Sequence, residues 1–512
     1  MKGDRSRPSR LLIVLFGFLC VGVLVRLFAV FGDLGFVGWD TYPLIEMSRL
    51  DGSADVLDVF TTSLMGKTDG GLYYRPLPKL TFSLDYALWR LWAPGYQLTS
   101  ILLLGVLAAA IYRLASELFG SGRSWGAIAA VLLVLLHPIQ ATVLPAPSRR
   151  PDVLAAVFML LCLTYQIRGV RRPSMATAFG TAVLGGLALV SKETAFILPP
   201  LALLAAFLYA PGNSAIVRVR QAVIHSAPLL LVTLCMLLVR FSVLGGFVGE
   251  RPMLEGDVLS AAATMSLRVA RLMFSGGAIV GAPDAAPLAL IIALFAAVVA
   301  GVQSNAPERA AVHRVLARPA IISLAWMVLV VATFTVGLIL QPWYVLNPLV
   351  AFALLVGASV EALILLVRSS HRARITGFVA FAGLAWLWVA LAAYSPVFRS
   401  YDDWTRMTDI TESYLGDLRV KLASAEPDSI VRIRGTPYFL TRRTDKLVQD
   451  EQPPLIGVTG IVEYSVEAWA KLMFPERSVR VRAAATEDRP GPGEILVLVG
   501  RRPLRQGARQ GR

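Results

Sequence analysis

The sequence predicts a polytopic α-helical membrane protein that ends in a small α/β domain. Of the 512 residues, 56% are hydrophobic and 16% are charged, whereas soluble globular proteins carry about 25% charged residues. Apolar stretches long enough to cross a bilayer, which takes about 20 helical residues, recur along the chain. After Tyr394 the composition becomes polar and mixed, without another stretch of that kind.

The apolar stretches predict about eleven membrane-spanning helices. The first is too long for the apolar part of a signal peptide, so we expect it to stay in the protein. The stretches lie at 11–31, 97–117, 125–142, 152–168, 175–191, 194–211, 223–243, 286–303, 319–340, 346–367 and 374–394.

The charges between these stretches predict the orientation. The net charge of +15 could indicate nucleic-acid binding, but the basic residues gather in alternate loops, as the positive-inside rule requires. We therefore expect no nucleic-acid partner, a cytoplasmic N-terminus and an extracytoplasmic C-terminal domain. The predicted inner loops contain Arg123, Arg168, Arg171, Arg172, Arg218, Arg220, Arg309, Arg314, Arg318, Arg368, Arg372 and Arg374.

We expect residues 1–394 to form the transmembrane domain, with long outer loops at about 32–96 and 245–285. Within these loops, the stretches 77–89 and 257–274 have the composition of helices that lie flat at the membrane interface.

The C-terminal part is expected to form an α/β domain at 395–500, followed by a disordered basic tail at 501–512. Apolar residues at helical spacing predict a helix over 407–422, and runs of β-branched residues predict strands at 430–433 and 495–499.

The cysteines predict neither a disulfide nor a zinc site. Cys20, Cys162 and Cys235 all lie in apolar stretches, without the spacing of metal ligands. The sequence shows no convincing ligand set for any other metal and no certain cofactor, although a divalent metal is compatible with it.

Four polar clusters fall on the predicted outer side, at the ends of apolar stretches. Ionisable residues at membrane depth are costly and usually mark a site. Such clusters would suit the transfer of a group from a lipid phosphate. Cations there could neutralise the leaving phosphate, and a carboxylate could accept a proton from the incoming hydroxyl. The clusters are Gly38-Trp39-Asp40, Tyr73-Tyr74-Arg75-Pro76-Leu77, His137-Pro138 continuing to Ser148-Arg149-Arg150-Pro151-Asp152, and Ser191-Lys192-Glu193-Thr194.

Each cluster also has a structural interpretation. Asp40 could cap a helix, and Lys192 could pair with Glu193 to close a turn. Arg149 and Arg150 could extend to the membrane interface. The histidine and the arginine that precede prolines in these clusters could likewise be structural.

Taken together, these segments resemble the GT-C class of membrane glycosyltransferases, and most of all its protein O-mannosyltransferase-like branch, which includes transmembrane proteins with TPR tails. The likeness covers about the first 200 residues, with one motif beyond them. Its motifs are Trp39-Asp40, Tyr74-Arg75-Pro76-Leu77, Asp85-Tyr86-Ala87-Leu88-Trp89, Pro94-Gly95-Tyr96, His137-Pro138, Arg150-Pro151-Asp152-Val153-Leu154, Ser191-Lys192-Glu193, and Arg240 with Leu244-Gly245-Gly246.

The resemblance implies a GT-C-like helical fold, a polyprenyl- or dolichyl-phosphate-linked sugar donor and an inverting transfer outside the cytoplasm. Asp40 matches the aspartate that serves as general base in the family. The residues implied to face the donor phosphate are Arg150, Lys192, Arg75, Arg149 and Arg240, and the implied supporting residues are Trp39, His137, Asp152 and Glu193.

The chain departs from the family pattern in several places. Thr41 replaces a second acid in the first loop, and Thr142 replaces an acid after the His-Pro pair. Gln97 and Ser100 stand where relatives often have His and Asn, Trp343-Tyr344 stands for an Arg-Tyr motif, and the TPR tail is absent. These departures leave the sugar and the acceptor open.

The sequence thus predicts a glycosyltransferase of a bacterial-type cytoplasmic membrane. Its acceptor would be a protein, a lipid or a glycan, and membrane lipids would surround the enzyme. One alternative is a transporter or flippase for lipid-linked glycans, which would place its charges within the spans. The other is an inactive relative that acts as a scaffold in envelope assembly.

Overall fold

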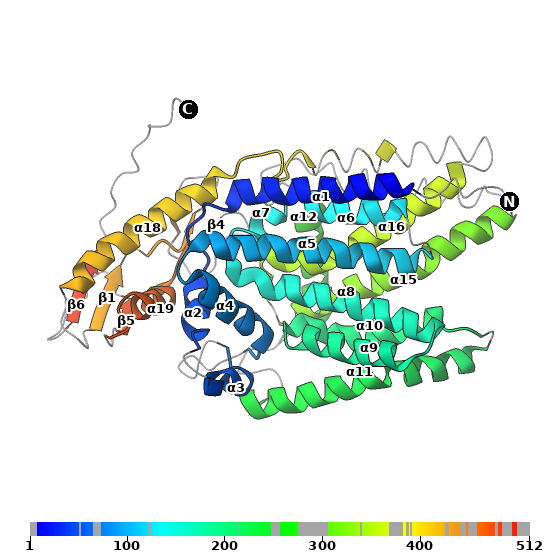
Figure 1. Cartoon of the computed structure of the whole chain (residues 1–512), viewed down its shortest axis with the longest axis horizontal. Helices are drawn as coiled ribbons and strands as arrows, with labels where there is room; N and C mark the ends of the chain where they lie inside the picture. The colour runs from blue at the N-terminus through cyan, green and yellow to red at the C-terminus, as the bar shows by residue number, and fades with distance from the viewer. Residues whose placement is uncertain are drawn as a thin grey trace. The chain divides into compact units, whose positions relative to one another are not determined.

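The computed structural model resolves the chain into two compact units, the first comprising Met1–Asp33 and Leu50–Tyr401 and the second Leu34–Arg49 and Asp402–Arg512 (Figure 1). The structure describes residues 8–50, 53–64, 73–120, 124–212, 214–246, 257–274, 306–337, 340–367, 382–383, 385, 389, 392–424, 430–434, 436–440, 447–448, 458–476, 480–483 and 494–498.

The first unit is helical. Its helices run side by side (Figure 1), and six of the described helical stretches are long and apolar enough to cross a membrane. The chain is therefore an integral multi-pass membrane protein. The elements are α1 (Arg10–Phe31), α3 (Ser53–Thr61), α4 (Pro76–Trp89), α5 (Ala93–Leu118), α6 (Trp125–Leu136), α7 (Gln140–Val143), η1 (Pro147–Arg149), α8 (Arg150–Arg171), α9 (Met175–Leu189), η2 (Glu193–Ile197), α10 (Leu198–Tyr209), α11 (Ala215–Leu244), α12 (Val258–Phe274), α15 (Ala306–Val336), η3 (Pro342–Val345) and α16 (Leu346–Val367).

Most predicted spans coincide with these helices, but the third is shorter than predicted. The apolar stretch 125–142 contains α6, which ends at Leu136, because Pro138 disfavours helical backbone at the residue before it. The predicted span at 286–303 and most of that at 374–394 lie outside the described residues. The number of about eleven spans therefore stays a prediction.

The close approach of α6 and α16 depends on two glycines. A Cβ atom on Gly126 would lie 2.1 Å from the carbonyl oxygen of Gly357, and one on Gly357 would lie 2.4 Å from that of Gly126. Small residues of this kind let membrane helices pack backbone to backbone. Any side chain at either position would push the two helices apart.

Helix α8 lies in the core of the first unit. In its apolar window 78% of the residues are buried, compared with 11% for α1. A helix that buries side chains all around its circumference is surrounded by other helices, and α8 contacts α5, α9 and α10. The residues at its first turn are therefore held rigidly.

The second unit combines two helices of the C-terminal part with two small sheets. Strands β5, β1 and β6 form a parallel sheet in the order β5-β1-β6, and β3-β2-β4 is antiparallel. The helix predicted at 407–422 lies within α18, and the two predicted strands are present. The elements are α2 (Thr41–Met47), α18 (Asp402–Ala423), β1 (Ile430–Arg434), β2 (Phe439–Leu440), β3 (Leu447–Val448), β4 (Val458–Thr459), α19 (Glu463–Met473), β5 (Arg480–Ala483) and β6 (Glu494–Leu498).

Residues 34–49 cluster with this second unit, although the predicted division placed the whole loop 32–96 in the transmembrane domain. Helix α2 packs against α19. The N–H of Gly38 donates to the carbonyl of Gly460 at 3.0 Å, and Gly38 adopts φ of 93°, a conformation that glycine tolerates without strain.

Candidate functional site

Three charged side chains from separate elements meet at the C-terminal end of α11. Arg75, which precedes α4, donates from Nε and Nη2 to Oε2 of Glu193 at 2.9 and 2.6 Å. Arg240 of α11 donates from Nη1 to the other carboxylate oxygen at 3.2 Å. One carboxylate therefore holds two guanidinium groups, and both arginines are largely buried, at 13% and 7% exposure. Although burial opposes it, Glu193 raises the pKa of Arg75.

A buried lysine–aspartate pair adjoins these residues. Lys192 Nζ lies 2.5 Å from Oδ1 of Asp152, in the first turn of α8, and both side chains are 4% exposed. The lysine nitrogen also lies 3.7 Å from the centre of the Tyr344 ring, a cation–π contact. Burial lowers the pKa of Lys192 to about 8, against the opposing effect of Asp152.

Together these five residues form what we call the cation cluster: Arg75, Asp152, Lys192, Glu193 and Arg240. Three cations against two carboxylates leave one excess positive charge in a largely buried place. Electrostatic attraction is stronger there than in water. The cation cluster can therefore attract and hold an anionic group such as a phosphate.

Arg150 is not part of the cation cluster. Its Nη1 lies 2.5 Å from Oδ2 of Asp85 on α4, and both side chains are 1% exposed. Its other nitrogens donate to Ser100 Oγ at 3.1 Å and to the Tyr96 carbonyl at 2.7 Å. The predicted phosphate contact of Arg150 is therefore revised, because its guanidinium is enclosed between α4 and α5.

Arg149 and His137 make contacts that hold the turns at these helix ends in place. The Arg149 guanidinium stacks on Trp343, 4.1 Å from the ring centre, and donates to the Thr142 carbonyl. The buried His137 ring contacts the Met273 carbonyl through Nε2 at 2.9 Å and accepts the Ile139 N–H at Nδ1 at 3.0 Å. The structural interpretation of His137 accordingly fits the geometry.

Sequence reasoning noted Trp343-Tyr344 as a departure from the family pattern and did not include either residue in the site. In the structure each ring holds one of the predicted cations, Trp343 under Arg149 and Tyr344 under Lys192. The only local signal was a pair of adjacent aromatic residues at the end of an apolar stretch, which is also typical of membrane interfaces.

Asp40 and Trp39 lie in the second unit. Asp40 precedes α2, but its side chain makes no capping hydrogen bond. Its Oδ1 accepts a hydrogen bond from the Tyr464 hydroxyl of α19 at 2.8 Å. The helix-cap interpretation of this carboxylate therefore does not fit.

The backbone beside Asp40 is held by the same unit. Trp39 stacks on Tyr438 with ring centres 5.0 Å apart, and its indole N–H donates to the Tyr438 carbonyl at 3.2 Å. The Ser465 hydroxyl donates to the Trp39 carbonyl. These contacts fix the backbone and the ring of the residue that precedes Asp40.

The described residues also bear on the predictions about metal ligands and disulfides. Among the described residues, no group of three or more His, Cys, Asp or Glu side chains could hold a metal ion. The three cysteines are free thiols, and Cys162 is buried within α8.

Comparisons with known proteins bear on this arrangement. Residues 92–243 match the family model described as dolichyl-phosphate-mannose-protein mannosyltransferase. A protein O-mannosyl-transferase of Caenorhabditis elegans is 25% identical over 209 residues, which cover 40% of this chain and 29% of that protein. The predicted resemblance to the O-mannosyltransferase-like branch of the GT-C class is confirmed. The matched residues include every member of the cation cluster except Arg75.

The chain is also similar to solved structures. ArnT from Cupriavidus metallidurans, determined with undecaprenyl phosphate bound, is similar with a TM-score of 0.50 and 14% identity, over 93% of this chain and 90% of that chain. The arabinofuranosyltransferase AftD from Mycobacteria has a TM-score of 0.47 and 18% identity, over 89% of this chain and 32% of that chain. This chain spans less than a third of the length of the Caenorhabditis elegans protein that it matches.

Proposed function

We propose that the protein transfers a sugar from a polyprenyl-phosphate-linked donor to an acceptor at the extracytoplasmic face of a bacterial-type cytoplasmic membrane. The observation that carries this proposal is the cation cluster, with its excess positive charge beside membrane helices. Two comparisons support this class of donor. The description of the matched family names dolichyl-phosphate-mannose, and ArnT was determined with undecaprenyl phosphate bound.

In the proposed reaction, an acceptor hydroxyl attacks the anomeric carbon of the sugar with inversion. The new glycosidic bond forms as the bond to the phosphate oxygen breaks, and the lipid phosphate leaves with the bonding electrons. We propose that Lys192, Arg75 and Arg240 stabilise its negative charge. Asp152 and Glu193 keep these cations in place when the donor is absent.

We propose that Asp40 accepts the proton of the acceptor hydroxyl. A phosphate is a good leaving group, so one carboxylate base is enough and a general acid is not required. Tyr464, through its hydrogen bond to Asp40, positions the carboxylate. We assign Arg149 and Arg150 to positioning roles, since each is engaged by neighbouring protein groups.

The same proposal includes the full topology: about eleven spans, a cytoplasmic N-terminus, and an extracytoplasmic C-terminal α/β domain. The cation cluster lies at the ends of helices, which suits a lipid head group better than transport through the spans.

The proposal is tested by mass spectrometry of envelope glycans and polyprenyl-phosphate sugars in a strain that lacks the gene. We expect one sugar to be missing from the glycans and its lipid-linked donor to build up, with both restored by the wild-type gene. Unchanged glycans and donor levels in the deletion strain would refute it.

We also expect donor binding to weaken as the pH rises through about 8. The lowered pKa means that Lys192 is protonated below this pH and loses its charge above it. The KM for the donor should therefore rise between pH 7 and pH 9 in wild-type protein. In Lys192→Arg the rise should be absent over this range, because arginine keeps its charge. Equal pH profiles for the two proteins would contradict a role for the lysine charge.

A further inference from the structure

A cavity lined by two arginines lies at the ends of the membrane helices opposite to the cation cluster. Helix α8 connects the two, because it begins beside Asp152 and ends at Arg171, which lines a cavity of about 320 Å³. The 22 residues of α8 extend over about 33 Å, close to the thickness of the hydrocarbon core of a bilayer. The cavity therefore lies at the other membrane surface.

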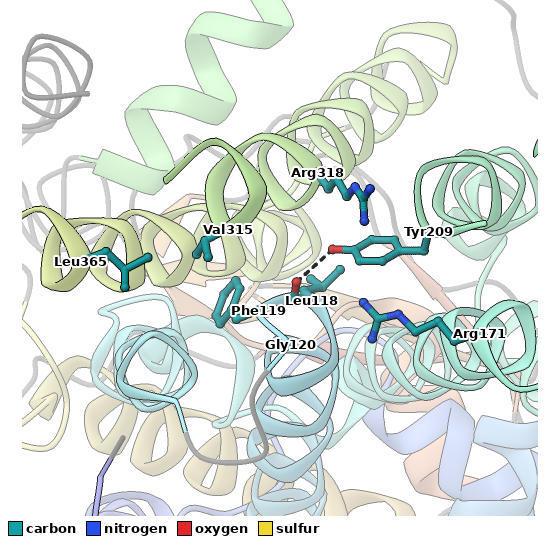
Figure 2. A pocket seen from close by; sticks show the side chains of 8 residues that line it. All are labelled: Leu118, Phe119, Gly120, Arg171, Tyr209, Val315, Arg318 and Leu365. Atoms are coloured by element: carbon teal, nitrogen blue, oxygen red, sulfur yellow. Dashed lines mark hydrogen bonds between the residues drawn. The ribbon is translucent and has the colours of Figure 1, made fainter. Parts of the chain in front are cut away.

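Two arginines in this cavity flank one aromatic ring. The guanidinium carbons of Arg171 and Arg318 lie 4.6 and 5.4 Å from the centre of the Tyr209 ring. Figure 2 shows the two arginines on opposite sides of that ring, which comes from the end of α10. The Tyr209 hydroxyl donates to the Leu118 carbonyl at 3.0 Å, so the ring is fixed. The tyrosine thus keeps both guanidinium groups at the cavity.

The positive charge of this place is only partly neutralised. Glu117 is shared by two arginines, with Arg168 Nη2 at 2.5 Å and Arg171 Nη1 at 3.4 Å. Within the described part of the chain, Arg318 forms no ion pair, and its guanidinium lies over the Tyr209 ring.

The nearby acid on α16 is already engaged elsewhere. Glu361 accepts hydrogen bonds from the Ser124 hydroxyl at 2.8 Å and the Gly126 N–H at 2.9 Å, at the start of α6. Among the described residues, the positive charges of Arg168, Arg171 and Arg318 exceed the negative charges of Glu117 and Glu361 at this end of the helices.

The remaining lining of the cavity is mostly apolar and comes from the C-terminal ends of α5 and α16 and from Val315 within α15. Its side chains include Phe119, Val315 and Leu365 (Figure 2). A small hydrated anion would satisfy the arginines but would leave these side chains in contact with water. A lipid supplies both a phosphate and a hydrocarbon chain, so it matches the two kinds of lining.

We propose that this cavity binds the phosphate group of an anionic phospholipid, with an acyl chain against the apolar lining. The basic loops at these helix ends place the cavity in the predicted cytoplasmic leaflet. The site would be separate from the proposed donor site, across the thickness of the membrane, and does not depend on the proposed reaction.

The test is native mass spectrometry of the purified full-length protein in detergent, titrated with phosphatidylglycerol, with phosphatidylcholine and with inorganic phosphate. We expect phosphatidylglycerol to bind in preference to the other two. Arg318→Gln should weaken its binding about fivefold, the effect of losing one arginine near a lipid phosphate. Arg318→Lys should keep most of the affinity. Arg220→Gln, which removes an exposed arginine of α11, should change it less than twofold.

Equal losses in Arg318→Gln and Arg220→Gln would overturn the proposal, because the effect would then be one of overall charge. Equal binding of phosphatidylcholine would also overturn it. Binding of inorganic phosphate without the lipid would exclude a lipid as the ligand. Thermal unfolding in lipid-free detergent shows whether the variants are folded, and the lysine variant provides a second comparison if the glutamine variant is not.

Discussion

Replacing Asp40 with asparagine is expected to lower sugar transfer by a factor of about 10² to 10⁴, the usual contribution of a general base. Asparagine has nearly the same shape and can still accept the hydrogen bond from the Tyr464 hydroxyl. It cannot take a proton from the acceptor hydroxyl. The loss should therefore fall on the rate of transfer, with the donor affinity and the amount of folded protein unchanged.

The measurement compares transfer rates in membranes matched for protein amount. Asp409→Asn serves as the control, because Asp409 is an exposed acid of α18 in the same unit. Full transfer activity in Asp40→Asn would exclude Asp40 as the base. Loss in both variants would point to a general effect of removing charge.

Tyr464→Phe separates orientation of Asp40 from catalysis by it. This change removes the hydroxyl that donates to Asp40 and keeps the ring. One hydrogen bond to a charged group is worth about 1.5 kcal/mol, so we expect a loss of about tenfold, well below that of Asp40→Asn. No loss at all would mean that the carboxylate is oriented by other contacts.

Replacing Asp85 with asparagine is expected to destabilise the protein by about 3–5 kcal/mol, because it leaves the Arg150 charge buried and unpaired. Arg150 is enclosed by Asp85, Ser100 and the Tyr96 carbonyl, and Thr99 donates to the second oxygen of Asp85 at 2.7 Å. The network joins α4, α5 and the start of α8. Its loss should loosen the helix that carries Asp152.

Thermal unfolding in detergent measures this effect when it is followed with a thiol-reactive dye in a background with Cys20→Ser and Cys235→Ser. The exposed Cys235 and half-buried Cys20 would otherwise react in the folded protein, whereas the buried Cys162 thiol becomes accessible on unfolding. Arg113→Gln, at an exposed position of α5, is the control and should change the free energy of unfolding by less than about 0.5 kcal/mol. The double variant Asp85→Leu with Arg150→Met should regain most of the stability, since it removes both buried charges. A single variant as stable as wild type would show that the pair does not join these helices.

Much of the membrane part follows from local patterns. The apolar stretches at 11–31, 97–117, 152–168 and 346–367 all correspond to long helices, because a run of about 20 apolar residues has few alternatives to a membrane helix. The stretch 77–89 was likewise predicted as a helix and is α4. The GT-C resemblance rested on the order and spacing of motifs, which can be read from the sequence without knowing the fold.

The roles of neighbouring cations depended on the tertiary structure. Arg149 and Arg150 are consecutive, yet one stacks on Trp343 and the other is buried against Asp85. Successive helical residues point about 100° apart, since a turn takes 3.6 residues, and only the surrounding helices decide which direction meets an acid. The sequence grouped both arginines with the phosphate ligands for lack of that information.

For Asp40, too, the sequence predicted the candidate role, whereas the tertiary structure decided its contacts. Its position after the first membrane helix and its aromatic neighbour could be recognised in the sequence, and they identified it as the candidate base. Its contacts with Tyr464, and those of Trp39 with Tyr438, join residues about 400 positions apart. Local periodicity describes only neighbours along the chain, so such pairings come from packing of the folded protein. The residue types and the membrane helices were therefore readable from the sequence, whereas the partners that orient each charged group were set by the three-dimensional fold.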